Sequence, residues 1–303
     1  MDKVVWTQKK LFGTQEKTGW LTILLLYAIL LNIAYLYLNP IFYMVSTMLK
    51  NNVDLLDPSV RWIPRSFEWN NLKLAWQGLD YLNALKNSVM ISGLGAIFHV
   101  IACALAGYAF AKFKFPGKTI LFGLLILSFL IPPQTIVIPL FMLIKNLGWM
   151  GTKFAIIGQA MFGHGIRGAL FVIIFTQFFR TLPKELDEAA RIDGAGSLRV
   201  LFQIIVPLAK PAILVVFLFS FIWHWNETYL TSLVIGSENT PLTLSLFNLQ
   251  TVLKGLYESE ADKMFNETIR MGASFLIIIP PLILYAIGQR WFVEGVERTG
   301  LIE

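Results

Sequence analysis

The sequence has little charge and few of the residues that form disulfides or metal centres. Only 15% of its 303 residues are charged, whereas soluble domains usually have about 25%. Its single cysteine, Cys103, lies inside an apolar run, which excludes a disulfide framework. The three histidines, His99, His164 and His224, are too dispersed for a zinc motif. We therefore expect neither a disulfide-stapled scaffold nor a bound metal.

The sequence also lacks a complete phosphate-binding loop. Gly117, Lys118 and Thr119 have the order that ends such a loop, but the motif also needs a glycine five positions before Gly117 and a strand ahead of it. Position 112 is Lys112, and an apolar run precedes it. We interpret these residues as a basic turn. The chain is therefore not expected to hydrolyse ATP or to bind a cofactor, and its energy must come from a partner or an ion gradient.

Long apolar runs are what the sequence has instead. Hydrophobic residues make up 56% of the chain, and the mean hydropathy is +0.63. A helix needs about 20 residues to cross roughly 30 Å of hydrocarbon, and backbone groups in lipid must bond internally, which favours helices. The sequence therefore predicts an all-α membrane protein with six transmembrane helices. The six runs are 20–49, 87–111, 119–144, 154–179, 209–235 and 268–289.

Lysine and arginine residues gather at alternate ends of these runs. They are frequent in residues 1–19, in the turn at 112–118, in 181–211 and in the C-terminal tail, and such loops usually face the cytoplasm. The net charge of +6 follows from this loop pattern and does not indicate a nucleic-acid partner. We expect a cytoplasmic N-terminal segment at 1–19, a transmembrane domain at 20–292 and a cytoplasmic tail at 293–303.

The longest polar stretch in the second half, residues 182–211, has the pattern of two short helices. Pro183 suits the first turn of the first helix, where its missing N–H costs nothing. Acidic residues follow it in the first turn, where the helix dipole favours negative charge. Gly194 and Gly196 are expected to end this helix.

Ser197 is the expected N-cap of the second helix, because its hydroxyl can accept a hydrogen bond from a free backbone N–H. Pro207 and Pro211 are expected to end the helix, since proline cannot continue its hydrogen bonding. One side of this helix is apolar. The residues on that side are Leu198, Leu201, Ile204 and Ile205.

A long and specific pattern runs through this stretch: Glu188-Ala189-Ala190, then Asp193-Gly194, a hydrophobic turn and two prolines. It resembles the EAA loop in the permease subunits of ATP-binding-cassette (ABC) importers. In that family the loop is a coupling helix that docks into a groove on a cytoplasmic ATPase subunit. The resemblance implies that these five residues of the coupling loop, 181–211, contact the ATPase. The spacing alone fits a solvated helical connection equally well.

Other segments resemble the carbohydrate-type permeases within that family, from about residue 20 to the end of the chain. The tail from Glu294 to Arg298 departs from the family's commoner neutral, glycine-rich ending, which leaves the subfamily and the sugar open. The segments that carry the likeness are Asn87-Ser88, Ala106-Gly107-Tyr108-Ala109-Phe110-Ala111-Lys112, Phe115-Pro116-Gly117, Ile131-Pro132, Ile138-Pro139-Leu140-Phe141, Leu147-Gly148, Trp225-Asn226-Glu227, Thr243-Leu244 and Gln289-Arg290-Trp291-Phe292-Val293.

The resemblance has consequences for the fold, the location and the partners. It implies a type I ABC importer permease fold in a bacterial plasma (inner) membrane, with both termini cytoplasmic. It also implies a second permease subunit in a heterodimer, two ATPase subunits that use ATP and Mg, an extracytoplasmic solute-binding protein and a sugar substrate. The substrate contacts can lie on either permease.

Polar residues in three of the apolar runs are expected to share one depth in the membrane. Gln134, His164, Arg167 and Asn226 lie at similar counts from the cytoplasmic ends of their runs, at heights of roughly 20 to 28 Å when each residue rises about 1.5 Å. An arginine at that depth costs at least about 2.5 kcal/mol unless it faces a cavity or a partner. We therefore predict a shared hydrated pathway for the sugar.

Trp223 and Trp225 lie beside this layer, and either could stack on an apolar sugar face. The alternatives are that each polar residue pairs separately with a neighbouring helix or with lipid headgroups, and that the tryptophans are interfacial anchors. Pro132, Pro133 and Pro139 flank Gln134. They fit a simple packing kink and a bend around a pathway equally well.

Two other classes of function were weighed against a permease. An ion-coupled secondary carrier of a small polar solute usually has inverted repeats and acidic residues within its spans, and here only Glu227 lies near the end of a run. No spacing of serine, histidine or acidic residues supports an intramembrane enzyme. The sequence therefore predicts a non-enzymatic permease subunit of an ATP-driven importer for sugars or oligosaccharides.

Overall fold

The computed structural model describes most of the chain, and the regular elements among the described residues are helices apart from one short strand pair. β1 (Gly13–Thr14) pairs antiparallel with β2 (Lys17–Thr18). The described residues form two compact units, one of residues up to 75 with 267–275 and one of 76–256 with 276–300. The described residues are 13–14, 17–165, 167–183, 185–186, 194–256 and 267–300.

The first unit contains the long apolar helix α2 (Trp20–Met48). Its 29 residues exceed the ~20 that a membrane span requires. The side chains from Trp20 to Tyr43 are exposed, with Asn39 half-buried. The buried side chains of α2 are Met44, Ser46, Thr47 and Met48, all in its last turns. The helix is therefore attached to its unit at its C-terminal end.

A buried lysine forms hydrogen bonds that hold the chain after α2 in place. Lys50 is only 5% exposed, and its ammonium donates to the carbonyl oxygens of Val60 at 2.7 Å and Arg61 at 3.1 Å. The Asn71 amide at the start of α4 (Asn70–Gly78) donates to the carbonyls of Met48 and Lys50. These bonds satisfy the charge, which would otherwise be costly to bury, and hold the start of α4 against the end of α2.

Two aspartates form further contacts in the loop between α2 and α4. Asn51 caps the short helix α3 (Asn52–Leu56), and the buried Asp54 accepts from the backbone N–H of Arg65 at 2.8 Å. The Arg65 guanidinium also pairs with Asp57. Hydrogen bonds from the hydroxyl and N–H of Ser59, followed by that of Arg65, lower the pKa of Asp57 to about 2. These contacts hold the loop in one structure, and the lowered pKa keeps the Asp57 carboxylate charged at neutral pH.

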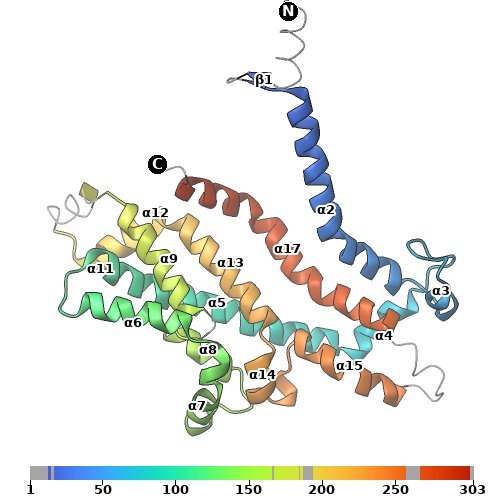
Figure 1. Cartoon of the computed structure of the whole chain (residues 1–303). Coiled ribbons are helices and arrows are strands. Elements are labelled where there is room, and N and C mark those ends of the chain that lie inside the picture. The colour runs from blue at the N-terminus through green and yellow to red at the C-terminus, as the bar shows by residue number, and fades with distance from the viewer. Residues whose placement is uncertain are drawn as a thin grey trace, which may run out of the picture. The chain divides into compact units, whose positions relative to one another are not determined.

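Helix α5 (Tyr81–Lys112) is the centre of the second unit, and α9 (Gly168–Thr181) and α13 (Lys210–Asn226) pack along it (Figure 1). The buried face of α5 carries small side chains. A Cβ on Gly107 would lie 2.6 Å from Cβ of Phe175, and one on Gly95 would lie 2.8 Å from the His224 ring. Small residues thus let the neighbouring helices approach closely, as is common in membrane bundles. The residues on this face include Ser88, Ser92, Gly95, Ala96, His99, Cys103 and Gly107.

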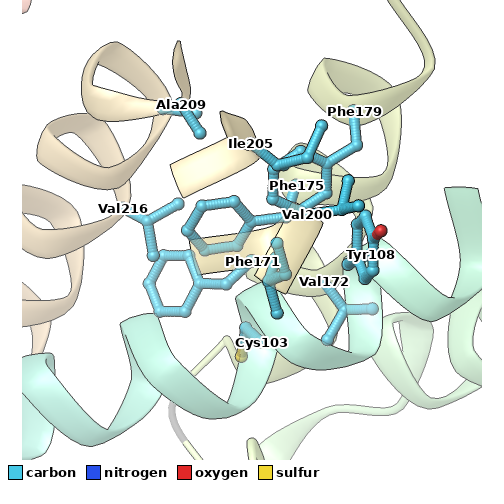
Figure 2. Packing of buried hydrophobic residues seen from close by; sticks show 12 residues of the cluster. Cys103, Tyr108, Phe171, Val172, Phe175, Phe179, Val200, Ile205, Ala209 and Val216 are labelled. Atoms are coloured by element: carbon cyan, nitrogen blue, oxygen red, sulfur yellow. The ribbon is translucent and has the colours of Figure 1, made fainter. Parts of the chain in front are cut away.

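The apolar core of this unit is built around three phenylalanines of α9. Phe171, Phe175 and Phe179 recur every fourth residue, so they share one helix face, and all three are fully buried. Figure 2 shows Phe171 and Phe175 in the middle of this cluster, next to Val216 of α13. Val200, Leu201 and Ile205 complete the packing from α11 (Ser197–Val200) and the π-helix η1 (Leu201–Ile205). The core therefore joins α5, α9 and α13 to the end of the coupling loop.

Three of the expected spans are broken, and the fifth divides into α13 and α14 (Tyr229–Val234). The third divides into α6 (Lys118–Leu130) and α7 (Pro133–Asn146), which meet at 103°. The fourth divides into α8 (Phe154–Met161) and α9, with residues 162–167 between them. A proline pair lies at the first break and glycines at the second, and both residue types interrupt helices.

The span count follows from these breaks. Helices α2 and α5 and residues 267–290 of α17 (Glu267–Gly300) are each long and apolar enough to cross a membrane. Two bent pairs raise the number to as many as five: α6 with α7, and residues 197–208 with α13. The run at 154–179 does not form one continuous helix. An all-helical membrane fold is confirmed, and the total of six spans stays a prediction.

The second helix of the polar stretch differs from its expected form. Gly196, not Ser197, is its N-cap, and no side chain bonds there. Leu198 is 68% exposed, so the buried apolar face begins at Val200. The helix runs on through Pro207 in α12 (Val206–Leu208) and ends at Ala209. Pro211 lies in the first turn of α13, where a missing N–H is tolerated. The helix therefore ends between the two prolines, before the next apolar run, as predicted, whereas the predicted cap at Ser197 was wrong.

The loops gather at opposite ends of α5. At its first end, Asn87 donates to the carbonyls of Glu238 and Thr240, near the 3-10 helix η2 (Ser237–Asn239). Ser88 accepts from the first N–H of α15 (Leu242–Leu256), and the chain after α14 (Tyr229–Val234) pairs with Gly151. At the other end, the Lys112 ammonium donates to the Leu182 carbonyl at 3.4 Å. Segments expected on the same side of the membrane thus meet.

Candidate functional site

The residues expected to contact an ATPase lie mostly outside the described part of the chain. Glu188, Ala189, Ala190 and Asp193 fall in the range 187–193, which the structure does not describe. Gly194 is described and has a φ of +78°, a backbone conformation that glycine adopts without strain. A Cβ at this position would meet nothing within 4 Å. The glycine is thus required by the backbone turn and not by local crowding.

The residues expected to line a pathway centre on the break in the fourth span. Arg167 is the N-cap of α9 and has a φ of +59°, an unusual conformation for a residue with a side chain. Its guanidinium carbon lies 5.7 Å from the ring centroid of Trp223 and 5.9 Å from that of Phe129. The structure therefore brings Arg167 and Trp223 together, as expected. It adds Phe129, which sequence reasoning missed because nothing distinguishes it from other apolar residues of its run.

Glycines form the turn before Arg167. Gly163 and Gly165 have φ values of +65° and +96°. A Cβ on Gly168 would overlap the carbonyl oxygen of Gly163, so the chain closes tightly on itself here. The N–H of His164 donates to the Gln159 carbonyl at 3.0 Å. The helix is therefore broken at these glycines, between the end of α8 and the start of α9.

A buried histidine holds this turn from α5. Nε2 of His99 lies 2.9 Å from the carbonyl oxygen of His164, and Nδ1 lies 2.9 Å from Oγ of Ser220. A carbonyl oxygen only accepts, so Nε2 must donate to it, and Nδ1 of the neutral ring accepts from the Ser220 hydroxyl. By the same reasoning, Nδ1 of His224 donates to the Ser220 carbonyl at 2.8 Å. His99, Ser220 and His224 therefore form one network between α5 and α13.

The sequence carries one signal for this network, in the row of small residues on α5. The three histidines are far apart in the chain, which suggested that they were unrelated. However, His99 belongs to the row of small residues on α5, with Gly95 and Cys103 on either side. A polar residue within such a row faces another helix and not lipid, because small residues mark helix contacts in membranes.

The other predicted pathway residues do not join this cluster within the described chain. The side chains of Gln134 and His164 are exposed, and His164 takes part through its carbonyl. The Asn226 amide donates to the Ile222 carbonyl of its own helix. Trp225 is 3% exposed and stacks on Phe221, so its ring offers no free face to a sugar. Its Nε1 has no hydrogen-bond partner among the described residues.

The enclosed space near these residues is small. One cavity of about 10 Å³ lies beside the glycine turn, which suits a single water molecule and is far too small for a sugar. Within the described ranges, no group of three histidine, cysteine, aspartate or glutamate side chains could hold a metal ion. The residues that line the cavity are Ile156, Gln159, His164, Gly165, His224 and Leu230.

Comparison with known proteins adds to this geometry. Residues 100–298 match the family model described as binding-protein-dependent transport system inner membrane component. A protein of Caldicellulosiruptor sp. (strain Rt8B.4) named as an ABC transporter permease is 30% identical over 256 residues, which cover 84% of this chain and 88% of the relative. The sn-glycerol-3-phosphate transport system permease protein UgpE of Yersinia enterocolitica is 31% identical and covers 77% of this chain and 81% of its own length.

A solved structure shares the fold. It is a chain of a bacterial ABC transporter involved in the import of the acidic polysaccharide alginate. The two chains superpose with a TM-score of 0.74 and 23% sequence identity, over 88% of this chain and 95% of that one. The type I ABC importer permease fold expected from the sequence is thereby confirmed.

Proposed function

Since this chain belongs to the family of binding-protein-dependent transport system inner membrane components, we propose that it forms half of the translocation pathway of an ATP-driven importer for sugars or oligosaccharides. The observation that carries the proposal is the family match over residues 100–298, which includes the EAA pattern at 188–194. The chain itself is a transport permease. ATP and Mg are used by the partner ATPase, and this subunit binds neither.

The coupling loop is the proposed contact with that ATPase. Its described end, α11 and η1, packs into the phenylalanine core through Val200, Leu201 and Ile205. A force applied to the loop is therefore transmitted to α9 and α13, because close-packed interiors move as units and do not deform smoothly. This connection supports a role for Glu188, Ala189, Ala190, Asp193 and Gly194 in coupling.

The remaining partners follow from the same assignment. We propose a heterodimer with a second permease, two ATPase subunits and an extracytoplasmic solute-binding protein, in a bacterial plasma membrane with both termini cytoplasmic. One relative is named for sn-glycerol-3-phosphate transport and the structural neighbour for alginate import, which supports a sugar or a related polyol as the substrate. Gln134, His164, Arg167, Trp223, Trp225 and Asn226 remain the proposed pathway residues.

A charge in the coupling helix tests the function. We expect Ala190→Glu to insert and assemble normally but to lose substrate-stimulated ATP hydrolysis in proteoliposomes, because bulk and charge prevent close docking. Ala190→Ser is the matched control and should retain coupling. At position 194, asparagine and aspartate have similar shape and similar backbone preference. A difference in coupling between Gly194→Asn and Gly194→Asp therefore measures the effect of the charge alone. The proposed coupling role would be contradicted if the Ala190→Glu variant bound the ATPase normally and kept substrate-stimulated hydrolysis.

Labelling tests the orientation. Single cysteines introduced as Val5→Cys and Gly300→Cys should react with a membrane-impermeant maleimide only from the cytoplasmic side. The native Cys103 is buried in the core and should give little background. Reaction of either introduced cysteine from outside would overturn the proposed topology. Co-purification with an ATPase then separates this function from that of an ion-coupled carrier, which needs none.

A further inference from the structure

We propose that Arg167, held between Phe129 and Trp223, forms a subsite for the anionic group of the substrate, so that the carbohydrate carries a carboxylate or a phosphate ester. This inference rests on the proposed function and specifies its substrate class. The geometry that points to it is the guanidinium position, 5.7 Å from the Trp223 ring and 5.9 Å from the Phe129 ring. The two rings come from α13 and α6, so three segments converge on one cation.

Arg167 has no acidic partner within the described residues. The ion pairs found there join Arg65 to Asp54 and Asp57, and Arg270 to Glu267. Glu227 is the acid at the end of α13, but its carboxylate already accepts from the N–H groups of Leu230 and Thr231 and from the Thr231 hydroxyl. This acid therefore does not neutralise the charge of Arg167, and the residue is exposed.

The magnitudes show that the aromatic contacts alone do not account for this arginine. An exposed cation–π contact stabilises an arginine by less than it costs to place that arginine inside a membrane span away from water and from a partner. The left-handed backbone of Arg167 adds to this cost, because the residue has a Cβ. The contacts of Arg167 with the two rings offset only part of this cost. Hydration and an anionic ligand can supply the remainder, so the position favours a wet pathway and a negative charge.

The aromatic contacts serve instead to fix the guanidinium. Trp223 stacks on Phe219 with ring centroids 5.6 Å apart and lies 5.4 Å from the Phe171 ring. The indole therefore cannot easily move, and it supports the arginine more than it offers a face to a sugar. A fixed guanidinium binds carboxylate or phosphate oxygens through two parallel hydrogen bonds. Preorganisation of this kind reduces the entropy lost on binding.

The test uses the complete complex in proteoliposomes with its binding protein and internal ATP. The probes are uronic-acid oligosaccharides and hexose phosphates, each compared with its neutral counterpart after carboxyl reduction or dephosphorylation. We expect the wild-type complex to take up one anionic probe at least tenfold faster than its neutral counterpart. The probe that is taken up identifies the group as carboxylate or phosphate. Arg167→Gln should remove at least tenfold of this preference, and Arg167→Lys should keep part of it.

Arg180→Gln is the matched control. Arg180 lies in the last turn of α9, and its guanidinium sits 5.5 Å from the Phe122 ring, so the same kind of contact is lost at the other end of the helix. Its loss should leave the ratio of anionic to neutral uptake unchanged. If neutral sugars enter as fast as anionic ones and Arg167→Gln keeps that ratio, the subsite is overturned while the importer function stands.

Two further outcomes are decisive. If ATP drives no uptake of any neutral or anionic carbohydrate, the proposed function falls together with the subsite. If Arg167→Gln fails to assemble while Arg167→Lys assembles and shows no anion preference, the arginine pairs with a carboxylate of the second permease. That result also overturns the subsite.

Discussion

The breaks in the third and fourth spans interrupt apolar helices by different means. The third break turns α6 against α7 by 103° at Pro132 and Pro133, and no hydrogen bond joins residues 128–135 to another element in the described chain. The fourth break, at 162–167, is tied to α5 by the bond from His99 to the His164 carbonyl. It is also packed so closely that Gly168 has no room for a methyl group.

The difference shows two ways to make a bend. Proline restricts the backbone covalently at its own position and at the one before it, so the third break needs no neighbour. Glycine only permits a turn and does not enforce it, so the fourth break depends on contacts from other helices. The fourth break is therefore the more demanding structure, and it is the one that carries Arg167.

The largest expected effect comes from adding one methyl group at the fourth break, compared with adding one in α6, which leads into the third break. Gly168→Ala places a Cβ on the carbonyl oxygen of Gly163, and we expect a loss of about 3 kcal/mol, because backbone overlap cannot be relieved by a side-chain shift. Gly123→Ala in α6 meets nothing within 4 Å and should gain up to about 1 kcal/mol from helix propensity. The yield of monodisperse protein and its thermal unfolding measure both. Equal stability of the two variants would contradict the comparison.

Removal of the histidine tie should have an intermediate effect. His99→Leu leaves the His164 carbonyl without its partner, which costs about 1–3 kcal/mol, whereas the Ser220 hydroxyl loses His99 but keeps its contact of 3.3 Å with Nδ1 of His224. Because both changes break one network, Ser220→Ala combined with His99→Leu should destabilise by less than the sum of the two. Gln134→Leu, at the exposed third break, should stay within about 0.5 kcal/mol of wild type. Strict additivity in thermal unfolding would argue against a shared network.

The smallest effect on stability is expected at the prolines. Pro132→Ala alone should keep the bend, because Pro133 still restricts the residue before it. The double variant Pro132→Ala with Pro133→Ala removes both restrictions, and the bend should open at a cost under about 1 kcal/mol. Spin labels introduced through Leu124→Cys and Met142→Cys would report a longer distance in the double variant only. An unchanged distance would show that the third break is also held by tertiary contacts.

Local patterns in the sequence predicted the local features of the fold. The apolar runs located the helices, and the resemblance at 188–194 indicated the family. The cap at Ser197 was predicted wrongly, since the helix begins one residue earlier in its hydrogen bonding, with Gly196 as N-cap. Propensity identifies suitable residues near a helix end but does not choose among neighbours.

Features that depend on distant contacts were not predicted. His99 and Ser220 are separated by 121 residues, and no periodicity connects them. Trp225 is buried while Trp223 is only partly buried, because helix rotation against α5 determines which tryptophan is covered. Counting residues from the ends of spans gave Gln134 and Asn226 similar heights to Arg167, but depth says nothing about lateral position. The convergence of Phe129, Arg167 and Trp223 is lateral, and it requires the fold.

The exposed length of α2 has a consequence for how this sequence can change over time. From Trp20 to Tyr43 no side chain is buried within the described chain, so the only requirement that the rest of this chain places on the segment is that it be apolar and helical. Exchanges among leucine, isoleucine, valine and phenylalanine should drift freely there. On α5, by contrast, Gly95 and Gly107 leave no room for one added carbon. The sequence of α2 is therefore constrained by the solvent around the helix, and the sequence of α5 by the helices packed against it.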